Sequence, residues 1–321
     1  MKRFKMTKTA LLTASLLLVF AFSVATVGAK EKYEEKFEKT VALTKEGKVD
    51  INNISGDIEV RTWGEDQVKI QALKISQASS LSKARENADK VKIEIMEEGN
   101  VLRIETKYPG SGKFWGGESV NVSVDYWLWI PEKASLEANN ISGNVDAEGP
   151  GGSVDLSAIS GDVHLRRASK GGDCSTISGD LEVTGVSGDI FLKSVSGDIT
   201  ATQIKGSIQA ETVSGNIEMN DVSEANVVRV KALSGEIDYR GRINREGTYS
   251  LKSHSGGIGM ALPSDSAFDF EAETFSGSIE SDFEIKVAGR ISAKEMRGVV
   301  NGGGASVKVS SFSGDIKLKK G

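Results

Sequence analysis

Apolar and polar residues alternate along most of this chain, and Ser-Gly pairs interrupt the alternation at regular intervals. These pairs begin at Ser55, Ser142, Ser160, Ser178, Ser187, Ser196, Ser214, Ser234, Ser255, Ser276 and Ser313. Strict alternation is typical of a half-buried strand, and glycine beside Asp or Asn is typical of a tight turn. The pattern therefore predicts short strands joined at glycine corners.

The spacing of the corners predicts stacked coils. From Ser142 the step is 18 residues four times and then 20 or 21 residues, and a half-step of 9 residues is visible between Ser178 and Ser214. A single coil cannot bury its apolar face, whereas coils stacked by parallel ladders enclose a continuous apolar interior. We expect an all-β chain, a single-stranded β-helix or β-solenoid with 18–21-residue coils of two strands and two turns each.

The region before Ser142 follows the repeat less closely. Its pattern predicts strands at 58–70, 91–106 and 120–130, and a short helix at 80–89. A solenoid needs a cover for its end coil. We therefore expect residues 41–135 to form an N-terminal β region and cap carrying one short helix, and residues 136–321 to form the solenoid repeats.

The N-terminus predicts export. Four basic residues among the first eight precede an uncharged apolar run and the small residues Val27-Gly28-Ala29. This order is typical of a secretory signal peptide, so residues 1–29 are assigned to one, with a retained membrane anchor as the alternative. We expect a periplasmic, cell-surface or extracellular protein with no transmembrane anchor after signal cleavage. Residues 30–40, which are rich in Lys and Glu, are predicted to form a charged linker or a short helix.

Composition and charge narrow the class of protein. The chain has 36 Gly, 4 Pro and a single Cys in 321 residues, which excludes collagen-like chains and disulfide frameworks. Its formal net charge is −5 and becomes more negative when the basic N-terminus is removed. Nucleic-acid binding needs a basic face, so we expect no nucleic-acid partner.

Acidic residues recur beside the glycine corners, with Asp180, Asp189 and Asp198 as the weak candidates for a metal site. Carboxylates stacked about 5 Å apart repel each other unless a cation or a donor lies between them, so calcium is one interpretation. The other is that these residues bond the backbone of the turn. Asn144 and Asn216 interrupt the row, and the calcium-binding nonapeptide is not matched. We prefer turn chemistry and expect no cofactor.

Alignment of the repeats positions the residues that could carry chemistry. His254 stands immediately before Ser-Gly, where other copies have apolar residues, and is predicted to face inward. His164 aligns with outward positions, and Cys174 aligns with Leu192, which predicts a buried, unreactive thiol. None has the partners that a catalytic residue needs, so we expect no enzyme.

The aromatic residues are the candidates for ligand or partner contact. Trp127 and Trp129 alternate along a predicted strand and line one face, either filling the cap core or contacting a partner. Phe114 and Trp115 stand among glycines in a predicted loop. Exposed aromatic side chains stack on sugars or on partner proteins, so this loop is the better candidate.

Two segments carry a family resemblance: residues 247–258 (GTYSLKSHSGGI) and residues 307–316 (VKVSSFSGDI). They resemble a bacterial adhesin-like family of unknown function, whose members are exported β-solenoids with repeated Ser-Gly-Asp-Ile turns. The resemblance extends from residue 41 to the C-terminus. It implies a cell-envelope protein and supplies no catalytic residues.

Three functions stay open at this point. The first is an exported, non-enzymatic cell-envelope or surface module, adhesin-like, that binds an envelope protein or a glycan. The second is a carbohydrate-active β-helix enzyme, which would need carboxylates clustered on one outward ladder. The third is an envelope-stress or signalling accessory protein. Lys317, Lys319 and Lys320 in the last predicted strand would oppose edge-to-edge pairing, which favours a monomer.

Overall fold

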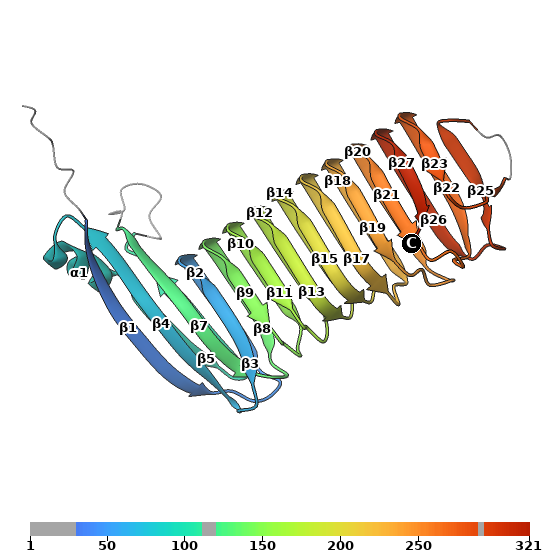
Figure 1. Ribbon diagram of the computed structural model, residues 1–321. Helices are drawn as coiled ribbons and strands as arrows, with labels where there is room; N and C mark the ends of the chain where they lie inside the picture. Colours follow the sequence, from blue (N-terminus) through green and yellow to red (C-terminus); the bar gives the residue numbers. More distant parts are fainter. Residues whose placement is uncertain (1–29, 111–119, 288–291) are drawn as a thin grey trace, which may run out of the picture.

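The computed structural model describes residues 30–110, 120–287 and 292–321, which form one elongated stack of strands (Figure 1). Two long sheets of 13 and 14 strands, here called sheet A and sheet B, run side by side along the stack. Residues 1–29, predicted to be a signal peptide, and the predicted loop residues Phe114 and Trp115 lie outside the described residues.

In spatial order, sheet A contains β1 (Glu31–Ala42), β4 (Gln67–Ala78), β7 (Val122–Pro131), β3 (Ile58–Trp63), β9 (Val145–Glu148), β11 (Val163–Arg166), β13 (Leu181–Ser187), β15 (Ile199–Lys205), β17 (Ile217–Ser223), β19 (Ile237–Gly241), β21 (Ile258–Leu262), β27 (Ile316–Lys320) and β23 (Ile279–Ser281). Sheet B contains β24 (Lys286–Val287), β25 (Glu295–Val300), β22 (Phe268–Ser276), β26 (Ala305–Ser313), β20 (Thr248–Ser255), β18 (Val227–Ser234), β16 (Ile208–Ser214), β14 (Ile190–Ser196), β12 (Gly172–Ser178), β10 (Val154–Ser160), β8 (Ser135–Ser142), β2 (Lys48–Ser55), β6 (Val101–Lys107) and β5 (Lys92–Glu98).

The core is a set of parallel ladders of apolar side chains between the two sheets. Ile199 pairs in register with Leu181 on one side and Ile217 on the other, and all three are at most 1% exposed. Alternate residues along each strand enter this core, because successive side chains of a strand point to opposite faces. The predicted all-β solenoid with two strands and two turns per coil is confirmed.

Glycine is required at the corners because the coils touch there through their backbones. Gly143 has φ +130°, and a Cβ added to it would lie 2.2 Å from the carbonyl oxygen of Gly56 in the adjacent coil. Any other residue would push two coils apart or strain the turn. The Ser-Gly repeat thus marks the positions at which successive coils approach each other most closely.

The predicted helix is confirmed as α1 (Leu81–Lys90), with the Ser80 hydroxyl accepting a hydrogen bond from the Lys83 amide. The segment 30–40 is a correction, because it is neither a linker nor a helix. It belongs to β1, which pairs antiparallel with β4 from Glu31 to Ala42. Tyr33 and Phe37 lie half-buried on β1, opposite the buried residues Ser76 and Ala72 of β4.

The coils are not stacked in sequence order at either end. The closing pair β26 and β27 inserts between β20/β21 and β22/β23, and β25 pairs antiparallel with β22 instead of forming a further parallel coil. At the other end, β2 and β3 lie between β6/β7 and β8/β9. The expectation that the final strand forms an exposed edge is therefore wrong, since β27 is paired on both sides.

Candidate binding surface beside the glycine corners

An exposed row of mostly apolar side chains runs along sheet B. It contains the residue that precedes the Ser-Gly pair at the end of each sheet B strand, in the spatial order Ile54, Ile141, Ile159, Ile177, Val195, Val213, Leu233, His254, Phe312 and Phe275. All are exposed except Ile54 and Val195, which are half-buried. We call this row the ridge. Its side chains reach 53% exposure at Leu233 and 73% at Phe275. Ten positions at strand spacing make a row about 43 Å long.

The ridge corrects the predicted phase of the repeat. His254 was expected to face inward, but it is exposed, and so are the aligned residues Val213 and Leu233. Contiguous exposed apolar surface of this kind marks an interaction site in soluble proteins. The ridge was not expected, because the alternation predicts that the apolar residues of the repeat lie in the core.

The hydrogen bonds of the corner explain why these apolar residues face solvent. The residue just before each ridge position points inward and is usually Ser, Thr or Asn. The Thr176 hydroxyl donates to the Gly161 carbonyl at 3.0 Å, and the Ser253 hydroxyl donates to the Gly235 carbonyl at 3.0 Å. A buried carbonyl needs such a partner. Because the polar residue takes the inward position, the next residue along the strand must face outward.

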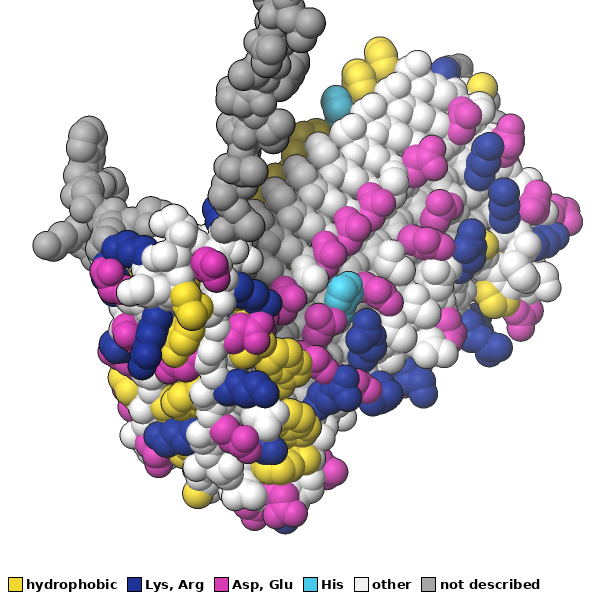
Figure 2. Space-filling model, turned by 60° about the vertical axis from the view of Figure 1, so that its left-hand side comes forward, with side chains coloured by type: hydrophobic (Ala, Val, Ile, Leu, Met, Phe, Trp, Pro, Cys, Tyr) yellow, Lys and Arg dark blue, Asp and Glu magenta, His cyan; other side chains and the backbone are white. Residues whose placement is uncertain are grey.

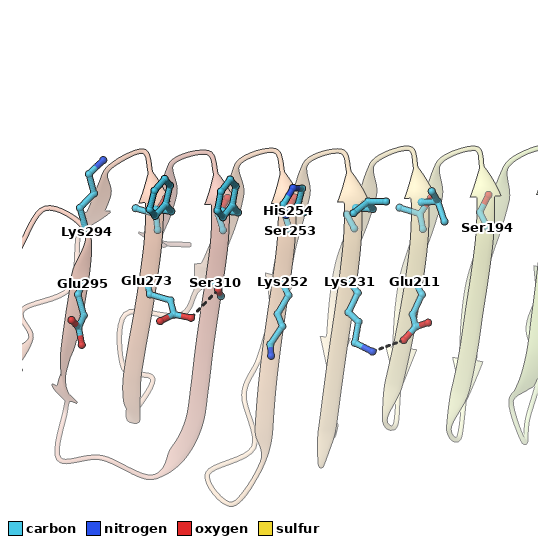
Figure 3. Close-up of a pocket in the computed structure, with 18 of the residues that line it drawn as sticks. Ser194, Glu211, Lys231, Lys252, Ser253, His254, Glu273, Lys294, Glu295 and Ser310 are labelled. Carbon is cyan, nitrogen blue, oxygen red and sulfur yellow. Dashed lines mark hydrogen bonds and ion pairs between the residues drawn. The ribbon is translucent and has the colours of Figure 1, made fainter.

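Aromatic rings stack at the C-terminal end of the ridge. The His254 and Phe312 rings lie 4.8 Å apart at an interplanar angle of 10°, and the Phe312 and Phe275 rings lie 4.8 Å apart at 4° (Figure 3). Both faces of the Phe312 ring are covered within this stack, and one face each of the His254 and Phe275 rings. The surface therefore presents mainly ring edges to an approaching partner.

A groove of about 820 Å³ follows this end of the ridge. Its second wall is a row of polar and charged side chains that includes Glu211, Lys231, Lys252, Glu273 and Glu295 (Figure 3). The Lys231 ammonium lies 2.8 Å from the Glu211 carboxylate, and the Ser310 hydroxyl donates to Glu273 at 3.1 Å. One wall of the groove is thus apolar and the other carries charges of both signs.

The acidic corner residues bind backbone amides of neighbouring coils. The Asp198 amide donates to Asp180 Oδ1 at 2.8 Å, and the Asn216 amide donates to Asp198 Oδ1 at 2.6 Å. At the C-terminal end Asp315 accepts from both the amide and the hydroxyl of Ser278, and these hydrogen bonds lower the pKa of the Asp315 carboxyl. Acidic side chains follow one another along the solenoid surface (Figure 2).

The three metal candidates do not lie together. Asp189 is at the opposite corner of the coil, where it accepts the Ser207 amide at 2.9 Å. Asp180 and Asp198 are neighbours in one ladder, each already engaged by an amide. Across residues 30–110, 120–287 and 292–321 no group of three or more His, Cys, Asp or Glu side chains has a geometry that could hold a metal ion.

Cys174 and His164 were also candidates for chemistry. Cys174 is buried, as predicted, and burial raises the pKa of its thiol, which disfavours the reactive thiolate. His164 faces outward, as predicted, with Nδ1 2.8 Å from Asp146 Oδ1 and Nε2 3.9 Å from Glu182 Oε2. This is a histidine between two surface carboxylates of its own ladder.

Trp127 and Trp129 lie half-buried on the outer face of β7, so the interpretation that they fill the cap core is wrong. Lys69 Nζ lies 5.3 Å from the centroid of the Trp129 ring, within the range of a cation–π contact. Trp127 lines a hollow of about 400 Å³ together with Leu73. Apolar side chains are visible among charged ones on this part of the molecule (Figure 2).

The described residues contain no helix of the length and apolarity needed to cross a bilayer. No curated protein matches the chain. Among solved structures, it is similar to a proposed cell adhesion protein from Clostridium sporogenes, with 13% identity, 90% of this chain and 100% of the other covered, and a TM-score of 0.29.

It is also similar to a proposed adhesin from Bacteroides fragilis, with 13% identity, coverage of 88% and 97%, and a TM-score of 0.39. A proposed lipid binding protein from Parabacteroides distasonis matches with 13% identity, coverage of 89% and 97%, and a TM-score of 0.36. The model of the Toastrack DUF4097 family matches residues 46–319. That match covers the strands of both sheets except β1, and the chain therefore belongs to the Toastrack DUF4097 family.

Proposed function

We propose that this protein is an exported, non-enzymatic binding module of the cell envelope, and that its contact surface is the ridge with its groove. The exposed apolar row of sheet B is the observation that carries this proposal. The basic, apolar and small-residue order of positions 1–29 supports export. The stacked coils serve as a rigid support that presents one row of side chains along its length.

A protein partner fits the ridge better than a glycan. Sugars bind by laying their apolar face on an exposed aromatic face. In the stack of His254, Phe312 and Phe275 the facing ring surfaces lie against each other. Ring edges and aliphatic side chains such as Leu233 suit the apolar side chains of a protein.

The groove points further to an amphipathic helix of the partner. It runs from β14 to β25, about 29 Å at strand spacing, which is the length of a helix of about 19 residues. The helical pitch of about 5.4 Å is close to the coil spacing of about 4.8 Å. A helix lying in the groove would place apolar residues on the ridge and charged residues against Glu211, Lys231 and Glu273.

The test compares a ridge variant with a matched control. In the ridge variant, Leu233, Phe275 and Phe312 are replaced by Ser. In the control, the outward residues of sheet A in the same three coils, Asp238, Glu280 and Lys317, are replaced by Ser. The processed protein and both variants are immobilised and exposed to solubilised envelope proteins and, separately, to purified cell-wall glycan.

We expect the wild type and the control to retain a common envelope protein, and the ridge variant to lose it at least tenfold without a change in thermal unfolding. Digestion of the captured protein on the column should leave a protected segment with apolar residues at i, i+3, i+4 and i+7. Equal retention by the ridge variant would contradict the proposal. Ridge-dependent retention of glycan alone, or sugar released from the glycan, would replace it with one of the alternatives.

The outer face of β7 is a second proposed contact surface. Trp127 and Trp129 are half-exposed there beside Lys69, and such aromatic residues are enriched in protein interfaces. Replacing both with Ser should weaken envelope binding while the ridge is intact. Unchanged binding by this double variant would remove the surface from consideration. Phe114 and Trp115 stay candidates by the same test with Ala.

A further inference from the structure

The two sheets end at four edges, and one of them differs from the rest. At one end of the stack sheet A closes with the three-residue β23 and sheet B with the two-residue β24. At the other end, β5 has seven residues and β1 has twelve. A long unpaired edge presents a row of free backbone groups that invites pairing with another strand. β1 is the outermost strand at its end of the molecule (Figure 1).

The sequence of β1 is complementary to itself when a second copy runs antiparallel. With Glu35 opposite Glu35 of the second copy, three kinds of cross-strand pair form, each of them twice. They are Glu31 with Lys39, Lys32 with Glu38, and Glu34 with Lys36. Opposite charges directly across an antiparallel pair stabilise it, and like charges destabilise it. The same register places Tyr33 opposite Phe37, so that these half-buried aromatic side chains meet across the interface.

The one like-charge contact in this register is already compensated. Glu35 would meet its own copy on the two-fold axis, but its carboxylate lies 3.1 Å from the ammonium of Lys74 in the same chain. Lys74 is on β4, directly opposite Glu35, and its side chain is 10% exposed. At the two-fold axis, each Glu35 carboxylate would therefore be paired with the Lys74 ammonium of its own chain.

Neighbouring registers are worse. A shift by one residue opposes Glu31 to Glu38 or Lys32 to Lys39, depending on its direction. Centring the pair on Phe37 avoids like charges but keeps two kinds of opposite-charge pair instead of three. The other long edge, β5, carries one Lys against three Glu and has no comparable self-complementarity.

We propose that two copies of this chain pair through β1, antiparallel about a two-fold axis at Glu35, and join their A sheets into one continuous sheet. A closed two-fold contact of this kind also removes the free edge, because each copy covers the other. The ridge lies on sheet B, so pairing through β1 leaves it accessible in both copies.

The test uses two charge variants of the processed protein. In the acidic variant, Lys32, Lys36 and Lys39 are replaced by Glu. In the basic variant, Glu31, Glu34 and Glu38 are replaced by Lys. Sedimentation velocity over a concentration series should show a dimer for the wild type, monomers for each variant alone, and a dimer again when the two are mixed. Replacing Lys317, Lys319 and Lys320 by Glu changes the charge equally on β27 and should leave the dimer intact.

A disulfide test fixes the register. With Glu35→Cys, mild oxidation should link two copies, because the two introduced thiols face each other at the axis, whereas Cys174 is buried. Efficient linking of a Phe37→Cys variant instead would place the axis two residues away and contradict the proposed register. A monomeric wild type at all concentrations, or acidic and basic variants that do not associate when mixed, would overturn the dimer. Neither outcome bears on binding at the ridge.

Discussion

The Ser-Gly-Asp corner combines three roles in adjacent residues. Glycine permits the backbones of successive coils to touch, as Gly143 does on the Gly56 carbonyl. The following Asp or Asn accepts the equivalent amide of the next coil, as Asp198 does for Asn216. The inward hydroxyl before the ridge position satisfies the glycine carbonyl, as Thr176 does for Gly161. A corner thus joins adjacent coils through a glycine carbonyl and a backbone amide.

We expect Asp198 to stabilise the stack as a hydrogen-bond acceptor. Asp198→Ala should lower the free energy of unfolding by about 1 kcal/mol, the value of one lost hydrogen bond. Asp198→Asn should be close to neutral, because Asn keeps Oδ1 and occurs at this corner in Asn144 and Asn216. Denaturant unfolding of both variants, with and without calcium, is the measurement. Equal losses for Asn and Ala that appear only with calcium would indicate a metal site instead.

At the scale of the element, the strands of the repeat were predicted correctly from the sequence. Which side chains face inward next to the Ser-Gly corners was not. Ile199 and Ile217 lie inside, where simple alternation of apolar and polar residues puts them. The ridge was placed inside because Val213 and Phe275 are apolar, and only the corner hydrogen bonds reveal that a neighbouring Thr takes the interior position. The sequence did contain a signal for this phase: a polar residue stands two positions before the Ser of most sheet B corners.

Strand β1 shows a second limit of pattern reading. Tyr33, Phe37 and Val41 recur every four residues among charges, a spacing that suits a helix face better than a strand. The segment is a strand because β4 offers it twelve paired positions. Such tertiary pairing overrides the local preference for secondary structure, and it cannot be predicted from the residues of the segment itself.

The interior ladder yields a direct test of strand phase. Ile199→Asp should lower the free energy of unfolding by about 4 kcal/mol or more, because it buries an unpaired carboxylate between Leu181 and Ile217. Gln209→Asp on the next strand, β16, which faces outward between Phe191 and Arg229, is the control and should change it by less than about 0.5 kcal/mol. Thermal unfolding of both variants measures the difference. A wild-type transition for Ile199→Asp would show that the ladder is assigned to the wrong face.

At the scale of the whole molecule, the stacking of coils was readable from the sequence, but their order was not. The coils of Ser276 and Ser313 have the same corner and the same alternation, so either could stack on the coil of Ser255. The structure places Ser313 next to Ser255 and Ser276 beyond it. The apolar ladders of these two coils are interchangeable, so they do not determine which coil stacks on the coil of Ser255. The connecting segments alone decide which coil lies inside.

The central claim about function is that the ridge, presented by a rigid stack of coils, is the contact surface of the protein. The most direct measurement is thiol labelling of a Leu233→Cys variant of the processed protein, with and without solubilised envelope proteins, beside an Asp238→Cys control. We predict rapid labelling of both introduced thiols in the free protein, and protection of the thiol at position 233 alone when envelope proteins are present. Slow labelling of Leu233→Cys in the free protein, or equal labelling with and without envelope proteins, would contradict the account.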